Sequence, residues 1–397
     1  MKNHPVLIVG AGIGGLSAAL ALLRKGMDVT VIEQTDALRE VGAGVQISPN
    51  GNRVLFELGL EKRIREVAFI PEGREVRLWN GGPGWSLPNQ GAAASAERYG
   101  APMLFLHRSD LHSALVDAVR ALKPDTIVLD ARCAEFSQTE DTVRVTTHKG
   151  EVFLGSALIG ADGVHSHIRQ KLFAAGKPEF TGLIAWRGSI PMEKVPQFER
   201  PISINWMGPA GSITAYPLRN GSILNFVATT SRSDWQVESW TEAGTTDEIL
   251  NDFAGWCDEV HEIIRAITTP YKWGLFKRQP ATQWVKGRIG LLGDACHSTL
   301  PSLGQGANMA IEDGFVLARA LSEKGSIEEG LIAYEGARRD RAAKIVNAST
   351  EHANRRRSPA LADPAKAKEY IATQWSANRV AEVYDWIFGY DAAASAI

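Results

Sequence analysis

Apolar residues near the start of the chain come in short blocks that a glycine-rich break separates. Residues 6–9 form one continuous, mostly branched run, which is typical of a parallel strand covered on both faces. Leucines at helical spacing follow and end at Gly26, after which residues 28–33 resume a strand pattern. The pattern predicts a strand–helix–strand unit over residues 5–34.

The rest of the chain divides into segments of different periodicity. Residues 82–100 are rich in Gly, Ala, Ser and Pro, which favours a long loop or a passage out of the first domain. Residues 183–229 alternate in the manner of strands, with turns between them, so we expect a mostly antiparallel sheet there. Residues 288–297 resume a buried strand, and residues 307–354 have helical periodicity. This order of elements indicates an α/β protein with a second, β-rich domain.

Composition narrows the class of partner. Lys and Arg number 43 against 45 Asp and Glu, so a formal charge of −2 provides no field for nucleic acid or anionic lipid. The three cysteines are scattered and form no C-x-x-C pair, so we expect no metal site and a reducing cytoplasm. Residues 1–10 leave no room for a leader, and the apolar stretch 16–23 is too short to span a bilayer. We expect a cytoplasmic protein with no membrane or nucleic-acid partner.

The glycine-rich break has the pattern Gly10-x-Gly12-x-x-Gly15, and Glu33 closes the second strand. Glycine lets backbone N–H groups and a helix N-terminus approach a pyrophosphate, and an acid about twenty residues later accepts from a ribose hydroxyl. A tight turn without a ligand is the alternative interpretation. An acid at this place favours a free 2′-hydroxyl, hence NAD or FAD rather than NADP. The candidate binding residues here are Gly10, Gly12, Ile13, Gly14, Gly15, Glu33 and Gln34.

Two later motifs end buried strands with a turn. Residues 157–169 bring Asp162-Gly163 to the end of a strand, although this pair is equally well explained as a simple turn. Residues 288–294 end at Asp294, whose carboxylate can bind hydroxyls of a cofactor's sugar-like chain. After a bend at Pro301, glycines open a helix, so N–H groups and the helix dipole can face an electron-rich ring. We call the glycine turn at residues 10–15 the first cradle and this later turn the second cradle. The residues of the second cradle are Gly304, Gln305, Gly306, Ala307 and Asn308.

Three stretches, in this order and at these distances, resemble the single-component FAD-dependent aromatic hydroxylases, the family typified by p-hydroxybenzoate hydroxylase and salicylate hydroxylase. They are GAGIGG at 10–15, GADGVHS at 160–166 and LLGDACHSTLPSLGQGANMAIEDG at 291–314. HRSDLHSAL, YPLR and YDWIFGYD are also similar to segments of salicylate and 3-hydroxybenzoate hydroxylases. The resemblance therefore covers nearly the whole chain.

The resemblance implies an FAD cofactor that NADH or NADPH reduces as co-substrate. It implies that Glu33 holds the adenosine ribose and that Asp294 binds the ribityl chain. The resemblance also implies one site for both cofactors, because such enzymes have no second nucleotide-binding domain, and this sequence shows no second complete glycine fingerprint either. The further contacts that it implies are Arg108 at the FAD phosphates, Gly44 and Val45 at the flavin, and Asp162 and Gly163 at both cofactors.

The resemblance also implies how the chain divides into domains. We expect a Rossmann-like FAD-binding domain of the p-hydroxybenzoate hydroxylase type at residues 1–75, 101–180 and 276–355. We expect an inserted, mostly antiparallel substrate domain at residues 76–100 and 181–275. Residues 356–397 are expected to form a helical segment, in which an aromatic cluster serves either internal packing or a homodimer contact.

The activity that the resemblance implies is hydroxylation of a small, already hydroxylated aromatic acid of the salicylate or 3-hydroxybenzoate type. It uses NAD(P)H and O₂ and proceeds through a flavin hydroperoxide. A hydroxypyridine such as 6-hydroxynicotinate is a second substrate class. An FAD-dependent oxidoreductase or halogenase without hydroxylation is an alternative, although the W-x-W-x-I-P run of halogenases is absent. A further alternative is a non-catalytic carrier or interaction protein of the dinucleotide fold that binds no flavin.

Such chemistry needs a pocket that excludes water and a base or hydrogen-bond chain for the phenol. The candidates are Ser212 and Tyr216 on the expected sheet, opposite His297 and Pro301. Several salicylate-like members carry a histidine in the strand before YPLR, where this chain has Gly211-Ser212-Ile213, and a serine can relay a proton but cannot be the primary base. His297 and Tyr216 each have a structural alternative, as a hydrogen-bonded residue near the flavin and as a core aromatic.

Other polar positions are weaker candidates. Trp206, Thr214 and Asn225 are expected on the same face of the sheet, and Gln46 and Arg53 are candidates for a substrate carboxylate. The RRRSP run at 355–359 is interpreted as a solvated helix surface rather than an anion site.

Overall fold

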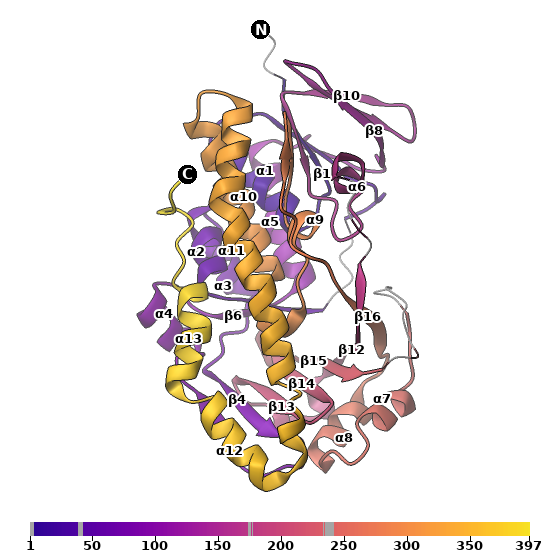
Figure 1. The fold of residues 1–397 in the computed structure, drawn as a ribbon, viewed down its shortest axis with the longest axis vertical. Coiled ribbons are helices and arrows are strands. Elements are labelled where there is room, and N and C mark those ends of the chain that lie inside the picture. The colour runs from indigo at the N-terminus through magenta and orange to yellow at the C-terminus, as the bar shows by residue number, and fades with distance from the viewer. Residues whose placement is uncertain (1–3, 39–42, 174–175, 177, 233, 235–241) are drawn as a thin grey trace.

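The predicted strand–helix–strand unit lies at the centre of a six-stranded sheet (Figure 1). The computed structural model describes residues 4–38, 43–173, 176, 178–232, 234 and 242–397. Across the sheet, the strands are β17 (Val285–Lys286), β18 (Ile289–Leu291), β11 (Ala157–Gly160), β1 (Val6–Val9), β2 (Val29–Ile32) and β7 (Ile127–Val128). The pairings are parallel except that of β17 with β18. The carboxyl ends of β1, β2, β11 and β18 therefore meet at one edge.

Helices and a small sheet cover the two faces of the six-stranded sheet. Helix α1 (Ile13–Arg24) packs between α5 (Arg108–Leu122) and α10 (Gly306–Glu323). The approach of α1 and α10 is close, because a Cβ on Gly314 would lie 2.6 Å from the backbone nitrogen of Ala18. The other layer is an antiparallel sheet of β8 (Cys133–Gln138), β9 (Val143–Thr147) and β10 (Val152–Gly155). These layers bury the apolar strand β1 on both sides, as the continuous run predicts.

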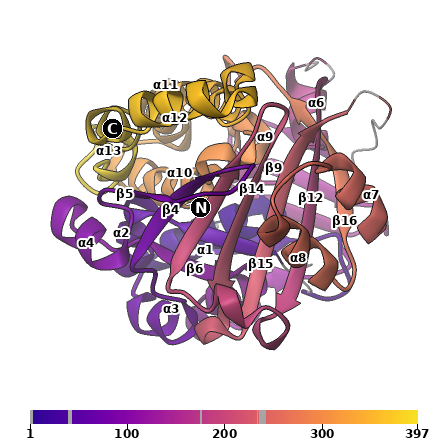
Figure 2. The same ribbon diagram turned by 90° about the horizontal axis from the view of Figure 1, so that it is seen from below.

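A second sheet has seven strands and forms the lower half of the molecule in Figure 1. Their order is β16 (Tyr271–Lys277), β12 (Glu179–Pro191), β15 (Ile223–Ser231), β14 (Gly211–Leu218), β13 (Ile202–Met207), β4 (Gly73–Leu78) and β5 (Trp85–Leu87). The pairings are antiparallel except that of β13 with β4. Figure 2 shows α7 (Thr246–Asp252) and α8 (Asp258–Ala266) lying over one face of this sheet. The α/β class and the antiparallel second sheet are confirmed.

Short elements join the two sheets. Strand β3 (Gly44–Ile47) pairs with β6 (Leu104–His107), and α2 (Pro49–Glu57), α3 (Glu61–Val67) and α6 (His167–Phe173) lie in the connections. The loop predicted at 82–100 is wrong in part, because this stretch contains β5 and the helix α4 (Ala92–Tyr99). Alanine is a strong helix former, and Gly100 ends α4 at a φ of 79°. Small residues and flanking glycines thus made a short helix look like a loop.

The C-terminal third is helical, as predicted. Helix α11 (Ile327–Arg355) runs from beside α10 down to the seven-stranded sheet, where α12 (Pro364–Gln374) and α13 (Ala377–Phe388) follow (Figure 1). Tyr384 and Phe388 are buried in a cluster that also holds Val76 and Tyr99, so these aromatic side chains pack within the chain. Among the described residues, no helix has the length and apolar character required to cross a membrane.

Candidate cofactor site and active site

The glycine turn after β1 is closed on one side and open on the other. Gly10 has a φ of 109°, and a Cβ there would lie 2.4 Å from the carbonyl oxygen of Ala161, at the end of β11. A Cβ on Gly15 would lie 2.0 Å from the carbonyl oxygen of Gly10. By contrast, a Cβ on Gly12 would meet no atom of the described residues within 4 Å, and none of their side chains caps the N-terminus of α1. The first N–H groups of α1, from Ile13 onward, are therefore available to a ligand on the Gly12 side.

Carboxylates lie at the ends of neighbouring parallel strands. Glu33, after β2, accepts hydrogen bonds from the backbone nitrogens of Ala11 (2.7 Å) and Thr35 (2.9 Å), so its position relative to the glycine turn is fixed. Asp294, after β18, is exposed at the same edge. Asp162 accepts from the hydroxyl of Ser166 (2.5 Å) and from the backbone nitrogen of Ile168 (3.1 Å), so its carboxylate is engaged by its own turn.

Gly14, Gly163 and Gln34 also lie at this end of the six-stranded sheet. A Cβ on Gly14 would lie 2.7 Å from Cδ2 of Leu292, so glycine permits α1 to pack against the end of β18. Gly163 has a φ of 75°, and Gln34 is exposed beside Glu33.

The second cradle, residues 304–308, follows the single helical turn of Pro301–Leu303. Gly304 has a left-handed φ of 65°, and α10 then begins at Gly306 without a side-chain cap. The amide of Asn308 is fully buried, accepts from the backbone nitrogen of Ser48 (3.0 Å) and donates to the carbonyl of Gly304 (2.8 Å). A Cβ on Gly306 would meet only a methyl carbon, at 3.7 Å. The backbone N–H groups of Gly306 and Ala307 therefore begin α10 on an open side of the turn.

These features fit a dinucleotide cofactor that carries a flavin. Two uncapped helix N-termini, those of α1 and α10, leave N–H groups available for phosphate and for a ring that becomes negatively charged. Two carboxylates at strand ends, Glu33 and Asp294, have the chemistry for sugar hydroxyls. Arg108 begins α5 beside this region, and its backbone nitrogen donates to the carbonyl of Ala43 (2.9 Å) just before β3.

The two sheets meet at Gly44, the first residue of β3. Its backbone nitrogen donates to the amide oxygen of Asn225 (2.8 Å), and a Cβ on Gly44 would lie 2.5 Å from the hydroxyl of Tyr216. Val45 follows and packs against the core of the six-stranded sheet. A cavity of about 200 Å³ opens beside this junction, lined by Ala43, Gly188, Ser189, Asn225, Thr268 and Tyr271.

The face of the seven-stranded sheet that meets β3 carries most of the expected polar residues. Tyr216 is buried, which raises the pKa of its phenol, and its ring lies 4.9 Å from that of Phe105. Ser212 lies on the same face with its hydroxyl 3.0 Å from that of Thr229, and among the described residues no basic side chain hydrogen-bonds this hydroxyl. The placement of Trp206 on this face is wrong, because its indole donates to Glu259 of α8 on the opposite face.

Arg53 is not directed at the cofactor side. Its guanidinium donates to the carbonyls of Tyr99 and Tyr390, so it joins α2 to α4 and to the C-terminal segment. Gln46, by contrast, has its side chain about 4 Å from the position of a Cβ on Gly304. Of the two candidates for a substrate carboxylate, the structure therefore brings only Gln46 to the second cradle.

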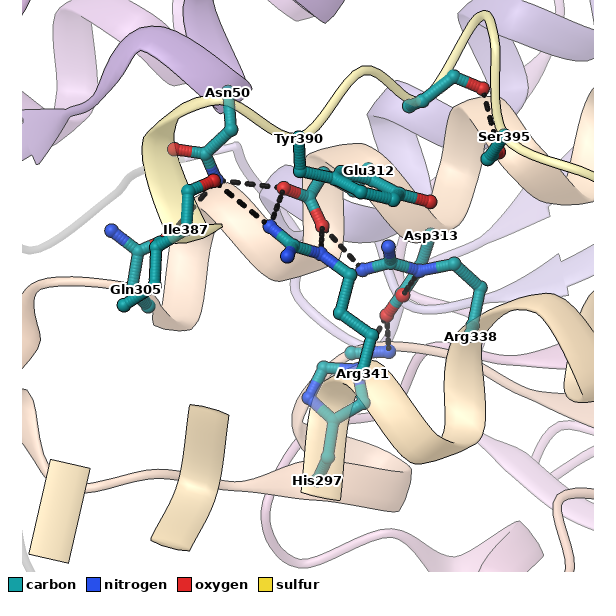
Figure 3. Close-up of polar contacts among 12 residues, drawn as sticks. Asn50, His297, Gln305, Glu312, Asp313, Arg338, Arg341, Ile387, Tyr390 and Ser395 are labelled. Atoms are coloured by element: carbon teal, nitrogen blue, oxygen red, sulfur yellow. Dashed lines mark hydrogen bonds and ion pairs between the residues drawn. The ribbon is translucent and has the colours of Figure 1, made fainter. Parts of the chain in front are cut away.

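His297 lies in a buried ion cluster (Figure 3). Its Nε2 is 2.5 Å from the carboxylate of Asp313, which also accepts from Arg338 (2.8 Å). Burial alone would lower the pKa of His297, but the charge of Asp313 outweighs it, so this pKa is raised well above 6.5. The pKa of Asp313 is lowered to about 2, because its attraction to His297 and Arg338 exceeds the effect of burial. His297 is therefore a buried cation at neutral pH.

The cluster extends to the second cradle through residues that the sequence interpretation missed. Glu312 pairs with Arg338 (2.6 Å) and Arg341 (2.9 Å), and it accepts from the amide of Asn50 (2.7 Å). Asn50 also donates to Gln305 (3.1 Å), the residue that precedes α10 (Figure 3). The signal was the acidic pair 312–313 between apolar residues in the middle of α10, because such charges are buried only when they are paired.

Comparison with known proteins identifies the family. The family model described as FAD binding domain matches residues 3–349. 3-Amino-4-hydroxybenzoate 2-monooxygenase PtnB3 of Streptomyces platensis is 34% identical over 391 residues, which cover 98% of this chain and 96% of that protein. 3-Hydroxybenzoate 6-hydroxylase 1 of Aquipseudomonas alcaligenes is 35% identical over 350 residues, 87% of each chain.

A solved structure agrees in fold. That of Klebsiella pneumoniae HpxO, complexed with FAD and uric acid, matches with a TM-score of 0.85 at 24% identity and covers 98% of each chain. The expected FAD cofactor is confirmed by the family match. The chain belongs to this family of FAD-binding domains and is a flavin-dependent aromatic monooxygenase.

Proposed function

We propose that the protein hydroxylates a small aromatic acid that already carries a hydroxyl group, of the salicylate or 3-hydroxybenzoate type, with NAD(P)H and O₂. The observation that carries the proposal is the junction at Gly44, where the β3 strand of the cofactor side meets Tyr216 and Asn225 of the seven-stranded sheet. The substrates of both relatives are aromatic acids that bear a hydroxyl group, which supports this class.

In this proposal, α1, Glu33 and Asp294 bind the dinucleotide, and the N–H groups of Gly306 and Ala307 face the flavin end. Bound FAD, once reduced, supplies the activation of O₂. The dipole of α10 stabilises negative charge near its N-terminus. The buried contacts of Asn308 and Gln305 hold this turn in place, so its N–H groups are already oriented when the ligand binds.

Tyr216 is proposed to hydrogen-bond the phenol oxygen of the substrate. The raised pKa keeps its hydroxyl protonated at neutral pH, so it can donate. Ser212 is proposed to relay a proton rather than to abstract one, because the partner of its hydroxyl among the described residues is the hydroxyl of Thr229, which is no base. His297 is proposed to stabilise the segment 293–297 as a cation, with Pro301 directing the chain from there into the second cradle.

The test is a screen of substrate-stimulated NADH and NADPH oxidation with salicylate, 3-hydroxybenzoate, 6-hydroxynicotinate and related rings. The expected result is strong stimulation by one hydroxylated aromatic acid and incorporation of oxygen-18 from labelled O₂ into the product. If only a hydroxypyridine stimulates NADH or NADPH oxidation, the substrate class is the hydroxypyridines rather than the hydroxylated aromatic acids. NADH oxidation that yields only hydrogen peroxide with every compound would contradict hydroxylation and favour an oxidoreductase without it.

A further inference from the structure

Arg356, which ends helix α11, is buried against the face of the seven-stranded sheet that carries Tyr216. It is 8% exposed, and its Nη2 donates to the amide oxygen of Asn205 (3.0 Å) and the hydroxyl of Thr214 (2.7 Å). Both acceptors are neutral. Burial lowers the pKa of Arg356 to about 10, and the charge of Arg74 adds to this effect. The interpretation of 355–359 as a solvated surface is therefore wrong for this residue.

Arg74, on β4, is a second cation, close enough to Arg356 for its charge to help lower the pKa of Arg356. Its Nη2 donates to the side-chain oxygen of Gln46 (2.6 Å), and its Nη1 lies 3.4 Å from the hydroxyl of Tyr384. The nearby His352 is buried, and burial together with the charges of neighbouring arginines, including Arg356 and Arg74, holds its pKa well below 6.5. Within the described part of the chain, neither Arg74 nor Arg356 forms an ion pair with an acid.

Buried donors around these two cations have no acceptor among the described residues. They are Nε of Arg74, Nε of Arg356 and the amide nitrogen of Asn205. A buried N–H group without a partner is unfavourable, and so is a buried charge without a counter-charge. Two guanidinium groups and an amide that offer only donors are suited to a planar anion with several lone pairs. A carboxylate is such an anion.

The position of the two arginines matches the substrate rather than the cofactor phosphates. Arg74 contacts Gln46, whose side chain is about 4 Å from the position of a Cβ on Gly304 in the second cradle. Thr214, which contacts Arg356, is two residues from Tyr216 on the same face of β14. The phosphate-binding end, at α1, lies instead at the edge of the six-stranded sheet.

We propose that Arg356 and Arg74 bind the carboxylate of the aromatic substrate and so select aromatic acids over neutral phenols. The proposal rests on the proposed function and adds the group that it recognises and the residues that do so. The carboxylate would accept from the free N–H groups of both arginines, and the ring would extend from there toward Tyr216 and the second cradle.

The test compares each acid with its uncharged amide on the flavin-loaded enzyme. Salicylate and salicylamide, and 3-hydroxybenzoate and 3-hydroxybenzamide, are titrated while the flavin absorbance is followed, and KM for NADH is measured in parallel. The variants are Arg356→Met and Arg74→Met. The matched control is Arg357→Met, because within the described residues the side chain of Arg357 hydrogen-bonds only Asn354, on its own helical turn.

We expect the wild type to bind at least one acid more tightly than its amide. Arg356→Met should weaken binding of that acid by about 10- to 100-fold, the usual effect of losing a charge-assisted hydrogen bond, and leave amide binding unchanged. Arg74→Met should act in the same direction, and Arg357→Met should change neither. If Arg356→Met does not fold, the binding of acid and amide to Arg74→Met tests the proposal in its place.

Three results would overturn the proposal. The first is a wild type that binds acid and amide equally well, and the second is an acid preference that both arginine variants retain while they still bind flavin. The third is a raised KM for NADH in the arginine variants without a change in acid binding, which would assign the cations to the nicotinamide cofactor. If an acid binds through these arginines but is not hydroxylated, the carboxylate site stands and the proposed function fails.

Discussion

Nε2 of His297 lies 2.5 Å from the carboxylate of Asp313, and the side chains of both residues are fully buried. Arg338, also fully buried, contacts the other oxygen of this carboxylate. Asp313 therefore balances the charge of His297, and it shares Arg338 with Glu312, whose carboxylate lies 2.6 Å from the same guanidinium. Removing one partner of a buried pair leaves an uncompensated charge in a medium of low dielectric constant.

We predict that Asp313→Asn lowers the free energy of unfolding by about 3–5 kcal/mol, because His297 then loses its counter-charge and Arg338 retains that of Glu312 alone among the described residues. Urea denaturation of the flavin-free protein measures this. The matched control is Glu61→Gln, which breaks the exposed pair with Arg65 and should cost less than about 1 kcal/mol. Equal effects of the two changes would contradict the role assigned to the buried cluster.

The same pair predicts a pH dependence of stability. The pKa of His297 is raised in the folded state, so its contribution is complete below pH 6.5 and is lost as the pH rises through the folded pKa. The pKa of Asp313 is lowered to about 2, so its contribution is present above pH 3.8 and is lost as the pH falls toward 2. The difference in unfolding free energy between wild type and His297→Gln should therefore shrink in alkaline solution, and a difference that grows would contradict the ion pair.

Gly12→Ala and Gly10→Ala should separate ligand binding from folding. A Cβ at Gly12 meets no atom of the described residues, so alanine should leave the stability of the flavin-free protein unchanged. The added methyl group should nevertheless block the pyrophosphate and raise the FAD dissociation constant about tenfold or more. Alanine at Gly10 meets the carbonyl of Ala161 and a positive φ, so it should destabilise the flavin-free protein by more than about 1 kcal/mol. Fluorescence titration with FAD and thermal unfolding give the two quantities, and an unchanged FAD affinity in Gly12→Ala would place the cofactor elsewhere.

Tyr216→Phe removes a hydroxyl beside Gly44. We expect stability to change by less than about 0.5 kcal/mol, because no described protein group hydrogen-bonds this hydroxyl. We also expect kcat/KM for the aromatic acid to fall about tenfold, through loss of the hydrogen bond to the substrate phenol. Oxygen-18 incorporation per NADH consumed shows whether hydroxylation also becomes uncoupled, and a variant that destabilises the protein without changing kcat/KM would mark Tyr216 as a packing residue.

Local patterns were sufficient to predict some of these elements. The unit β1–α1–β2 follows from the run at 6–9 and its glycine turn, because nearest neighbours along the chain determine it. The face on which Trp206 lies could not be predicted, because one step along a strand reverses the side and only the registry with β14 fixes it.

The two site features that were missed depend on distant contacts. Arg356 and Arg357 are adjacent in one charged run, and only the docking of α11 on the sheet buries the first and leaves the second partly exposed. The acidic pair 312–313 was missed, because its partners Arg338 and Asn50 come from elements on either side of it in the sequence.

The open sides of the two cradles belong to segments from opposite ends of the family match, residues 10–15 and 304–308. During synthesis on the ribosome, the first cradle emerges early and must wait for nearly all of the catalytic fold before the second exists. FAD can therefore be held at both ends only after residues 304–308 have emerged and α10 has packed against α1. Uptake of the cofactor through both cradles should for that reason accompany completion of the fold rather than the early stages of synthesis.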